Sequence, residues 1–404
     1  MSNRLSFHFL WAGQALANLG DVFYIVSMIT TVYYVTGSAA FMAFVPFVIA
    51  FSRFFGGIAA PWVLDRLSLK SVLVTSQSVK TGLLLVFTII LFSGLHLENI
   101  FLLFLFASII AFLDGWANPA RNAMLPRIVD KEELVKANSF LSIVDQSVQL
   151  GGWAISGIIV AVLGNDLLIF ITFMLFVASS ILMSLLNDPT VTSEEDTKSK
   201  TQWESFKEGW TTIWHKPSLK GITLIDILDS IAGVVWIAAI LYIYVEEVIQ
   251  KSEAWWGYIN ATFFIGLIIG GMFSFRMEKI IKQHLYLFIM LGCLLYAGFT
   301  LWFGLLSAPW LALVISISIG ISLQFKSIAQ QTIVQFSADH EILPKVYSAQ
   351  DAMLTFTFAV STLLFGYLTD MLGVRSVFVI AAAITFLSSI VSIIFRKQFR
   401  RIDA

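Results

Sequence analysis

The 404-residue sequence has few charged residues and almost no cysteine, and each shortage excludes a class of protein. Only 13% of the residues are charged and 58% are hydrophobic, whereas soluble globular chains carry roughly 25% charged residues. The single cysteine, Cys293, excludes an internal disulfide and a cysteine-based metal site. These shortages indicate an integral membrane protein without a resident metal.

Signatures of nucleotide chemistry are missing as well. The sequence has no Gly-x4-Gly-Lys-Ser/Thr loop for phosphates, and its five histidines are scattered along the chain. We therefore expect no enzymatic activity, no cofactor and no nucleic-acid partner.

What the sequence has in abundance is long apolar segments. A membrane-spanning helix needs roughly 20 largely apolar residues, and this length predicts an all-α protein with twelve spans. The candidate spans are 7–35, 41–64, 71–94, 99–120, 138–163, 166–187, 220–245, 255–275, 284–306, 309–331, 348–371 and 374–395. The first is too long for a signal peptide and is interpreted as a span.

The basic residues predict the orientation of these spans. Of 25 Lys and Arg residues, 20 lie at the two termini or in alternate connections, all on one predicted side. Lys251 and Arg375 lie on the other side, and Arg53, Lys80 and Lys326 lie within spans. Because basic residues collect on the cytoplasmic side, both termini are predicted to be cytoplasmic.

A long polar connection, 188–219, divides the sequence into an N-terminal half, 1–187, and a C-terminal half, 220–404. Aromatic residues spaced by three and four between Gln202 and Trp214 favour an amphipathic helix on the inner membrane surface. An ordinary linker is the alternative.

The two halves resemble each other at a nearly constant offset. Gly56 and Gly266 are 210 residues apart, as are Arg66 and Arg276. Further pairs, such as Ser139 with Ser348, are 209 residues apart. We therefore predict two six-helix bundles related by a pseudo-two-fold axis along the membrane normal.

Four motifs resemble one transporter family. They are the Asp65-Arg66 turn after the second span, Phe9–Gln14 with Leu19–Asp21, Asn118–Pro126, and Leu134–Ser139. The turn resembles the loop signature of the major facilitator superfamily, although Pro61 and Ser68 replace two of its glycines. The other three resemble the bacterial macrolide-efflux and enterobactin-exporter type. The resemblance implies a monomeric secondary transporter of the bacterial plasma membrane that works by alternating access.

Ionisable residues within spans are candidates for transport because burying a charge in a membrane is costly. Asp21 and Arg53 lie near the middle of successive spans and are predicted to form an ion pair. Asp21 would bind a proton or a cationic substrate; a permanent structural pair is the alternative. Asp226 and Asp229 lie early in the span 220–245, and Asp229 follows Asp21 by 208 residues.

Other candidates concern gating and the substrate cavity. An Asp114–Lys326 contact is predicted as an inner latch, with interfacial snorkelling of these side chains as the alternative. Tyr24 and Trp236 are predicted to line the cavity. The predicted gating residues, which could instead serve only as topological markers, are Asp65, Arg66, Lys70, Arg121 and Arg276.

These features predict proton-coupled efflux of a small amphipathic compound, drug-like or macrolide-like. The expected partners are the small-molecule substrate, protons and membrane lipid. Export of a siderophore or related metal-binding metabolite is an alternative, and a non-transporting receptor or scaffold is another.

Overall fold

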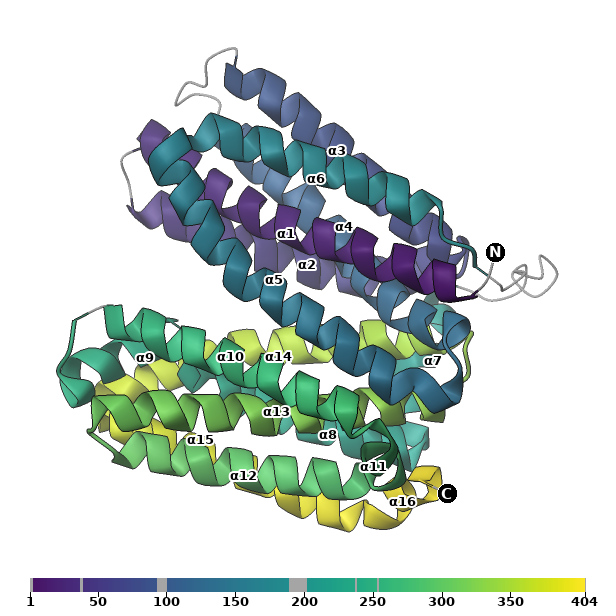
Figure 1. Ribbon diagram of the computed structural model, residues 1–404, viewed down its shortest axis with the longest axis vertical. Coiled ribbons are helices and arrows are strands. Elements are labelled where there is room, and N and C mark those ends of the chain that lie inside the picture. The colour runs from purple at the N-terminus through teal and green to yellow at the C-terminus, as the bar shows by residue number, and fades with distance from the viewer. Residues whose placement is uncertain are drawn as a thin grey trace. The chain divides into compact units, whose positions relative to one another are not determined.

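The computed structural model describes residues 3–36, 39–92, 100–188, 202–236, 238–252 and 254–403, which are almost entirely helical (Figure 1). No β-strand occurs in these ranges. The predicted all-α class is therefore confirmed.

The first half of the chain supplies six long helices and a shorter one. They are α1 (Asn3–Thr36), α2 (Ala39–Leu64), α3 (Leu69–Phe92), α4 (Ile100–Ile128), α5 (Leu134–Leu163), α6 (Asn165–Ser184) and the shorter α7 (Gln202–His215). Helix α7 covers the segment for which we predicted an amphipathic helix. Its Ile213 side chain is buried and Trp214 is exposed, while the Trp203 and Phe206 side chains lie outside the described residues. Its placement on the membrane surface remains a prediction.

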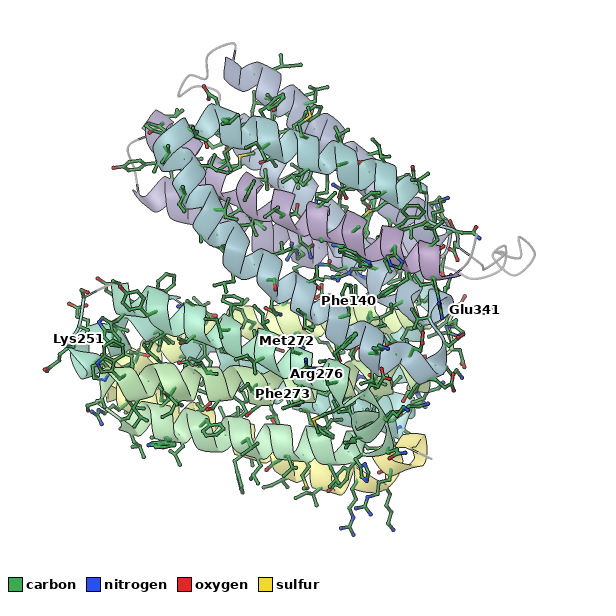
Figure 2. All side chains as sticks on the ribbon, in the orientation of Figure 1. Phe140, Lys251, Met272, Phe273, Arg276 and Glu341 are labelled. Atoms are coloured by element: carbon green, nitrogen blue, oxygen red, sulfur yellow. The ribbon has the colours of Figure 1, made fainter. Side chains whose placement is uncertain are left out.

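The second half repeats this pattern with additional short helices. They are α8 (Pro217–Ala232), α9 (Ala238–Tyr244), α10 (Ala254–Arg276), α11 (Glu278–Gln283), α12 (Leu285–Leu305), α13 (Pro309–Ser337), α14 (Leu343–Leu372), α15 (Val374–Ile394) and α16 (Arg396–Asp403). Figure 2 shows Lys251 before the start of α10 and Arg276 near its end. These two basic residues therefore lie at opposite ends of one span.

Eleven helices in the described ranges are long and apolar enough to cross a membrane. A bent pair, Pro217–Trp236 with Ile240–Ile249, supplies a twelfth span if the pair is counted as one. We predicted one continuous helix over 220–245, whereas a 3-10 turn, Gly233–Trp236, interrupts it. Glycine and β-branched valines are weak helix formers, which accounts for a break at Gly-Val-Val.

The chain forms two compact units. Unit 1 comprises residues 1–130, 147–210 and 340–352; unit 2 comprises 131–146, 211–339 and 353–404. The units therefore follow the two sequence halves except that α5, α7 and α14 are each divided between them.

The same helix pairs pack together inside each unit. In unit 1, α1 packs on α6, α2 on α4, and α3 on both α4 and α6. In unit 2, α8 packs on α15, α10 on α13, and α12 on both α13 and α15. Figure 1 shows α1 alongside α6 and α12 alongside α15. The repeat predicted from sequence offsets is thus a repeat of packing.

Glycines explain part of this repetition. A Cβ atom on Gly56 of α2 would overlap the backbone carbonyl of Phe112 on α4. A Cβ atom on Gly266 of α10 would likewise overlap the carbonyl of Ile317 on α13. Small residues allow membrane helices to approach closely, so the offset of 210 residues marks the same helix crossing in each unit.

Candidate functional site

Unit 1 contains a cluster of four charges, one from each of its first four helices. The Lys80 ammonium on α3 lies 2.7 Å from Asp21 Oδ1 on α1 and 2.7 Å from Asp114 Oδ1 on α4. The Arg53 guanidinium on α2 lies 3.4 Å from Asp114 Oδ2. This four-charge cluster (Asp21, Arg53, Lys80 and Asp114) is balanced, with two carboxylates and two cations.

The members of the four-charge cluster differ in their access to solvent. The Lys80 side chain is 2% exposed, that of Asp21 is 21% exposed and that of Arg53 is 39% exposed. Lys80 also lies 4.9 Å from the ring centre of Phe176, which supplies a further favourable contact for the cation. Lys80 is therefore the fixed centre of the cluster, and Asp21 is a more accessible carboxylate.

The predicted ion pair between Asp21 and Arg53 differs from the observed arrangement. Asp21 pairs with Lys80, and Arg53 pairs with Asp114. Helical spacing places residues at a similar depth but does not say which faces meet. The lysine in the middle of α3 was visible in the sequence as an intramembrane charge, and that signal could have identified Lys80 as the partner.

Unit 2 contains a second charged group on α8 and α13. The Lys326 ammonium pairs with Asp229 Oδ2, and the Ser388 hydroxyl donates to Asp229 Oδ1 at 3.2 Å. The Gln330 amide donates to Asp226 Oδ1 at 2.8 Å. Asp229 is thus matched by a cation, whereas the recorded partner of Asp226 is a neutral amide.

These residues line a polar cavity of about 400 Å³ within unit 2. This volume lies within the usual range for small-molecule sites. The cavity is lined by Ser142, Gln146, Asp226, Asp229, Ser230, Leu267, Leu323, Gln324, Lys326, Ser327, Gln330 and Leu354. The lining combines many hydrogen-bonding groups with three leucines, so it can hold a molecule with both polar and apolar parts.

The predicted latch between Asp114 and Lys326 gains no support from these contacts. Asp114 is neutralised by Lys80 and Arg53, and Lys326 is neutralised by Asp229, each within its own unit. Each charge already has the partner that a buried charge needs.

The turn containing Asp65 has a partner that the sequence did not reveal. The Lys345 ammonium lies 2.5 Å from Asp65 Oδ1 and 2.7 Å from Glu208 Oε2. Lys345 is largely buried and belongs to the segment of α14 within unit 1. It therefore joins the α2–α3 turn, α7 and α14. The long sequence separation of these residues explains why spacing could not predict the contact.

The other predicted gating residues have different surroundings. Arg66 and Arg276 are exposed, at the α2–α3 turn and at the end of α10, whereas Lys70 and Arg121 are half-buried. Their gating role remains a prediction.

The two predicted cavity aromatics lie in packed hydrophobic clusters. Tyr24 is buried in a cluster that includes Met28 and Phe176. Trp236 packs edge-on against Phe303, with ring centres 4.8 Å apart. Neither lines the polar cavity in unit 2. Large aromatic side chains bury much apolar area, which favours these interior positions.

Comparison with known proteins gives a consistent family match. The sequence model described as Major Facilitator Superfamily matches residues 10–350. The uncharacterized MFS-type transporter YfmI of Bacillus subtilis (strain 168) is 30% identical over 383 residues, covering 93% of each chain. Macrolide efflux protein A of Streptococcus pyogenes is 20% identical over 99% of this chain and 98% of its own.

Solved structures share the fold at low sequence identity. A bacterial homologue of the iron transporter ferroportin superposes with a TM-score of 0.78 at 14% identity, over 97% of this chain and 99% of its own. The fucose:proton symporter of E. coli superposes with a TM-score of 0.74 at 14% identity, over 98% of this chain and 99% of its own. At these identities the likeness concerns the fold alone.

Proposed function

Since this chain belongs to the major facilitator superfamily, we propose that it is a proton-coupled exporter of small amphipathic compounds that carry a positive charge. Membership makes the chain a multi-pass membrane transporter and not an enzyme. The observation that carries the proposal is the charge imbalance in the polar cavity. Asp226 and Asp229 face the single cation Lys326 there.

The substrate would be held by Asp226. Asp229 is matched by Lys326 and Ser388, so the second carboxylate is available for a ligand cation. Leu267, Leu323 and Leu354 would contact its apolar part. A positive group near a carboxylate of low solvent exposure gains more from the attraction than it would in water.

The coupling proton would bind at Asp21. Asp21 has Lys80 as its ion-pair partner, whereas Asp114 has both Lys80 and Arg53. When Asp21 accepts a proton, Lys80 keeps Asp114 as a counter-ion, so no cation is left unpaired. The same step at Asp114 would leave Arg53 without its carboxylate.

Gating would involve the Asp65–Lys345 contact, because breaking it frees the inner turn from α14. We place the protein in a bacterial plasma membrane with both termini in the cytoplasm, as the distribution of basic residues predicts.

Two relationships rank the alternatives. Macrolide efflux protein A, a relative by sequence, supports efflux of a drug-like compound. Siderophores bind metal ions through anionic oxygen groups, which the excess carboxylate of the polar cavity would repel. Siderophore export is therefore the second candidate.

Proteoliposomes test the proposal with tetraphenylphosphonium as a lipophilic cation. We expect an imposed proton gradient to drive its movement through the wild-type protein, and Asp226→Asn to abolish this movement. The control is Asp370→Asn, which neutralises an exposed carboxylate of α14 outside the polar cavity. Equal transport by wild type and Asp226→Asn would refute the substrate role of Asp226. A wild-type protein that moves neither this cation nor other amphipathic amines, even in counterflow, would favour a receptor or scaffold.

A further inference from the structure

The C-terminal helix α16 is attached to unit 2 by one face. Its Phe399 side chain is fully buried. A Cβ atom on Gly221 of α8 would lie 2.9 Å from Phe399 Cζ, so ring and helix are in close contact. The Arg400 guanidinium lies 5.2 Å from the ring centre of Tyr286 on α12. Helix α16 is therefore fixed against α8 and α12 and is not a free tail.

The other face of α16 is basic. Phe395 and Phe399 are four residues apart and share the packed side, while Arg396, Lys397 and Arg400 are exposed. No ion pair of Arg396 or Lys397 occurs with any residue in the described ranges. We call Arg396, Lys397 and Arg400 the basic ridge.

The basic ridge directly follows a surface suited to lipid tails. Ile390, Ile393 and Ile394 of α15 are exposed, and Ile394 retains 66% of its accessible surface. Exposed apolar side chains on a spanning helix contact the hydrocarbon of the bilayer. The basic ridge begins two residues after Ile394, which is the depth of the headgroups, where basic side chains gather.

We propose that the basic ridge of α16 is a binding site for the headgroups of anionic phospholipids. The ligand is a lipid phosphate at the edge of the hydrocarbon, because the ridge is continuous with the exposed isoleucines. Three uncompensated cations on a fixed helix match a negative headgroup. Near an anionic membrane surface, each basic residue strengthens binding by roughly fivefold.

A bound headgroup would also steady the polar cavity. Phe399 packs on Gly221, and Gly221 lies five residues before Asp226 on α8. A lipid that holds α16 in place thus holds the end of α8 that leads to the cavity carboxylates. The lipid site does not depend on which substrate is carried or on proton coupling.

The test uses the full-length protein in detergent, titrated with dioctanoyl phosphatidylglycerol and followed by native mass spectrometry. We expect Arg396→Gln/Lys397→Gln to bind this lipid roughly 25-fold more weakly than wild type. The matched control is Lys131→Gln/Lys279→Gln, which removes two exposed basic residues elsewhere in unit 2 and should bind like wild type. Lys397→Arg, which keeps the charge, should also bind like wild type.

Two further measurements complete the test. Thermal melting without added lipid should be the same for all variants, because the substituted side chains are exposed. Equal weakening in the control pair would show that overall charge, and not α16, attracts the lipid. Equal binding of dioctanoyl phosphatidylcholine, or displacement of the lipid by inorganic phosphate at equal concentration, would overturn the proposal.

Discussion

Asp21 and Asp229 occupy the same position in the first helix of their respective units, yet each is neutralised by a lysine from a different helix. Asp21 pairs with Lys80 on α3, the third helix of its unit. Asp229 pairs with Lys326 on α13, the counterpart of the fourth. The repeat thus preserves the carboxylate and varies its partner, which is consistent with different roles for the two sites.

The charge balance of each unit supports this division. The four-charge cluster of unit 1 has equal numbers of carboxylates and cations. The polar cavity of unit 2 has one carboxylate in excess. A balanced, largely buried cluster suits a proton switch, whereas an unbalanced cavity suits a cationic ligand.

We expect Lys80→Met to destabilise the protein severely. Lys80 is 2% exposed and neutralises both Asp21 and Asp114, so its loss leaves two carboxylates with Arg53 as their remaining cation. Removing one partner of a buried ion pair costs about 3–5 kcal/mol in soluble proteins. Thermal melting in detergent measures the effect, with the exposed Lys251→Met as the control. A melting temperature equal to that of wild type would contradict the central role of Lys80.

We expect Asp65→Asn and Lys345→Gln each to slow transport by a similar factor. Both break the 2.5 Å contact that joins the α2–α3 turn to α14. Because one contact is lost in either case, the double variant should be no slower than Lys345→Gln alone. Initial rates of cation movement in proteoliposomes measure this coupling.

The control for the turn is Arg66→Gln, which changes an exposed neighbour of Asp65. If the turn acts only as a topological marker, Asp65→Asn should transport normally. Arg66→Gln and a matching change at Lys70 would then be the harmful substitutions.

The sequence was sufficient to predict the helical fold because hydrophobic length is a local property. All twelve predicted spans correspond to helices, including the broken segment that begins at Pro217. The offset between Gly56 and Gly266 also indicated a repeated crossing, because both glycines serve the same close backbone contact.

The partners of the charged residues could not be predicted in the same way. Asp21 was identified by its depth, but its partner depended on the rotation of α1 and α3 about their axes. Lys345 is polar in sequence like many residues at a helix start, and its contact with Asp65 spans most of the chain. Tyr24 was assigned to the cavity wall because of its helix, although packing places it in the interior.

We expect Gly266→Leu to prevent accumulation of folded protein. Its side chain would overlap the carbonyl of Ile317, where α10 and α13 cross. The matched control is Gly298→Leu on α12, because a Cβ atom there meets nothing within 4 Å. Size-exclusion chromatography after solubilisation should give a monodisperse peak for Gly298→Leu only. A monodisperse Gly266→Leu protein with unchanged melting would contradict the close crossing.

The final prediction separates a proton site from a structural ion pair at Asp21. Asp21→Asn should fold, because Lys80 keeps Asp114 at 2.7 Å. Lys80→Gln should fold poorly, because it leaves Asp21 and Asp114 without their shared cation. The double variant Asp21→Asn/Lys80→Gln should recover folding, since Asp114 then retains Arg53 and the other two side chains are neutral. Transport then distinguishes the two interpretations. If Asp21 carries the coupling proton, the double variant exchanges tetraphenylphosphonium in counterflow but does not move it in response to a proton gradient. If the pair is purely structural, gradient-driven movement returns together with folding, and Asp21 has no part in coupling.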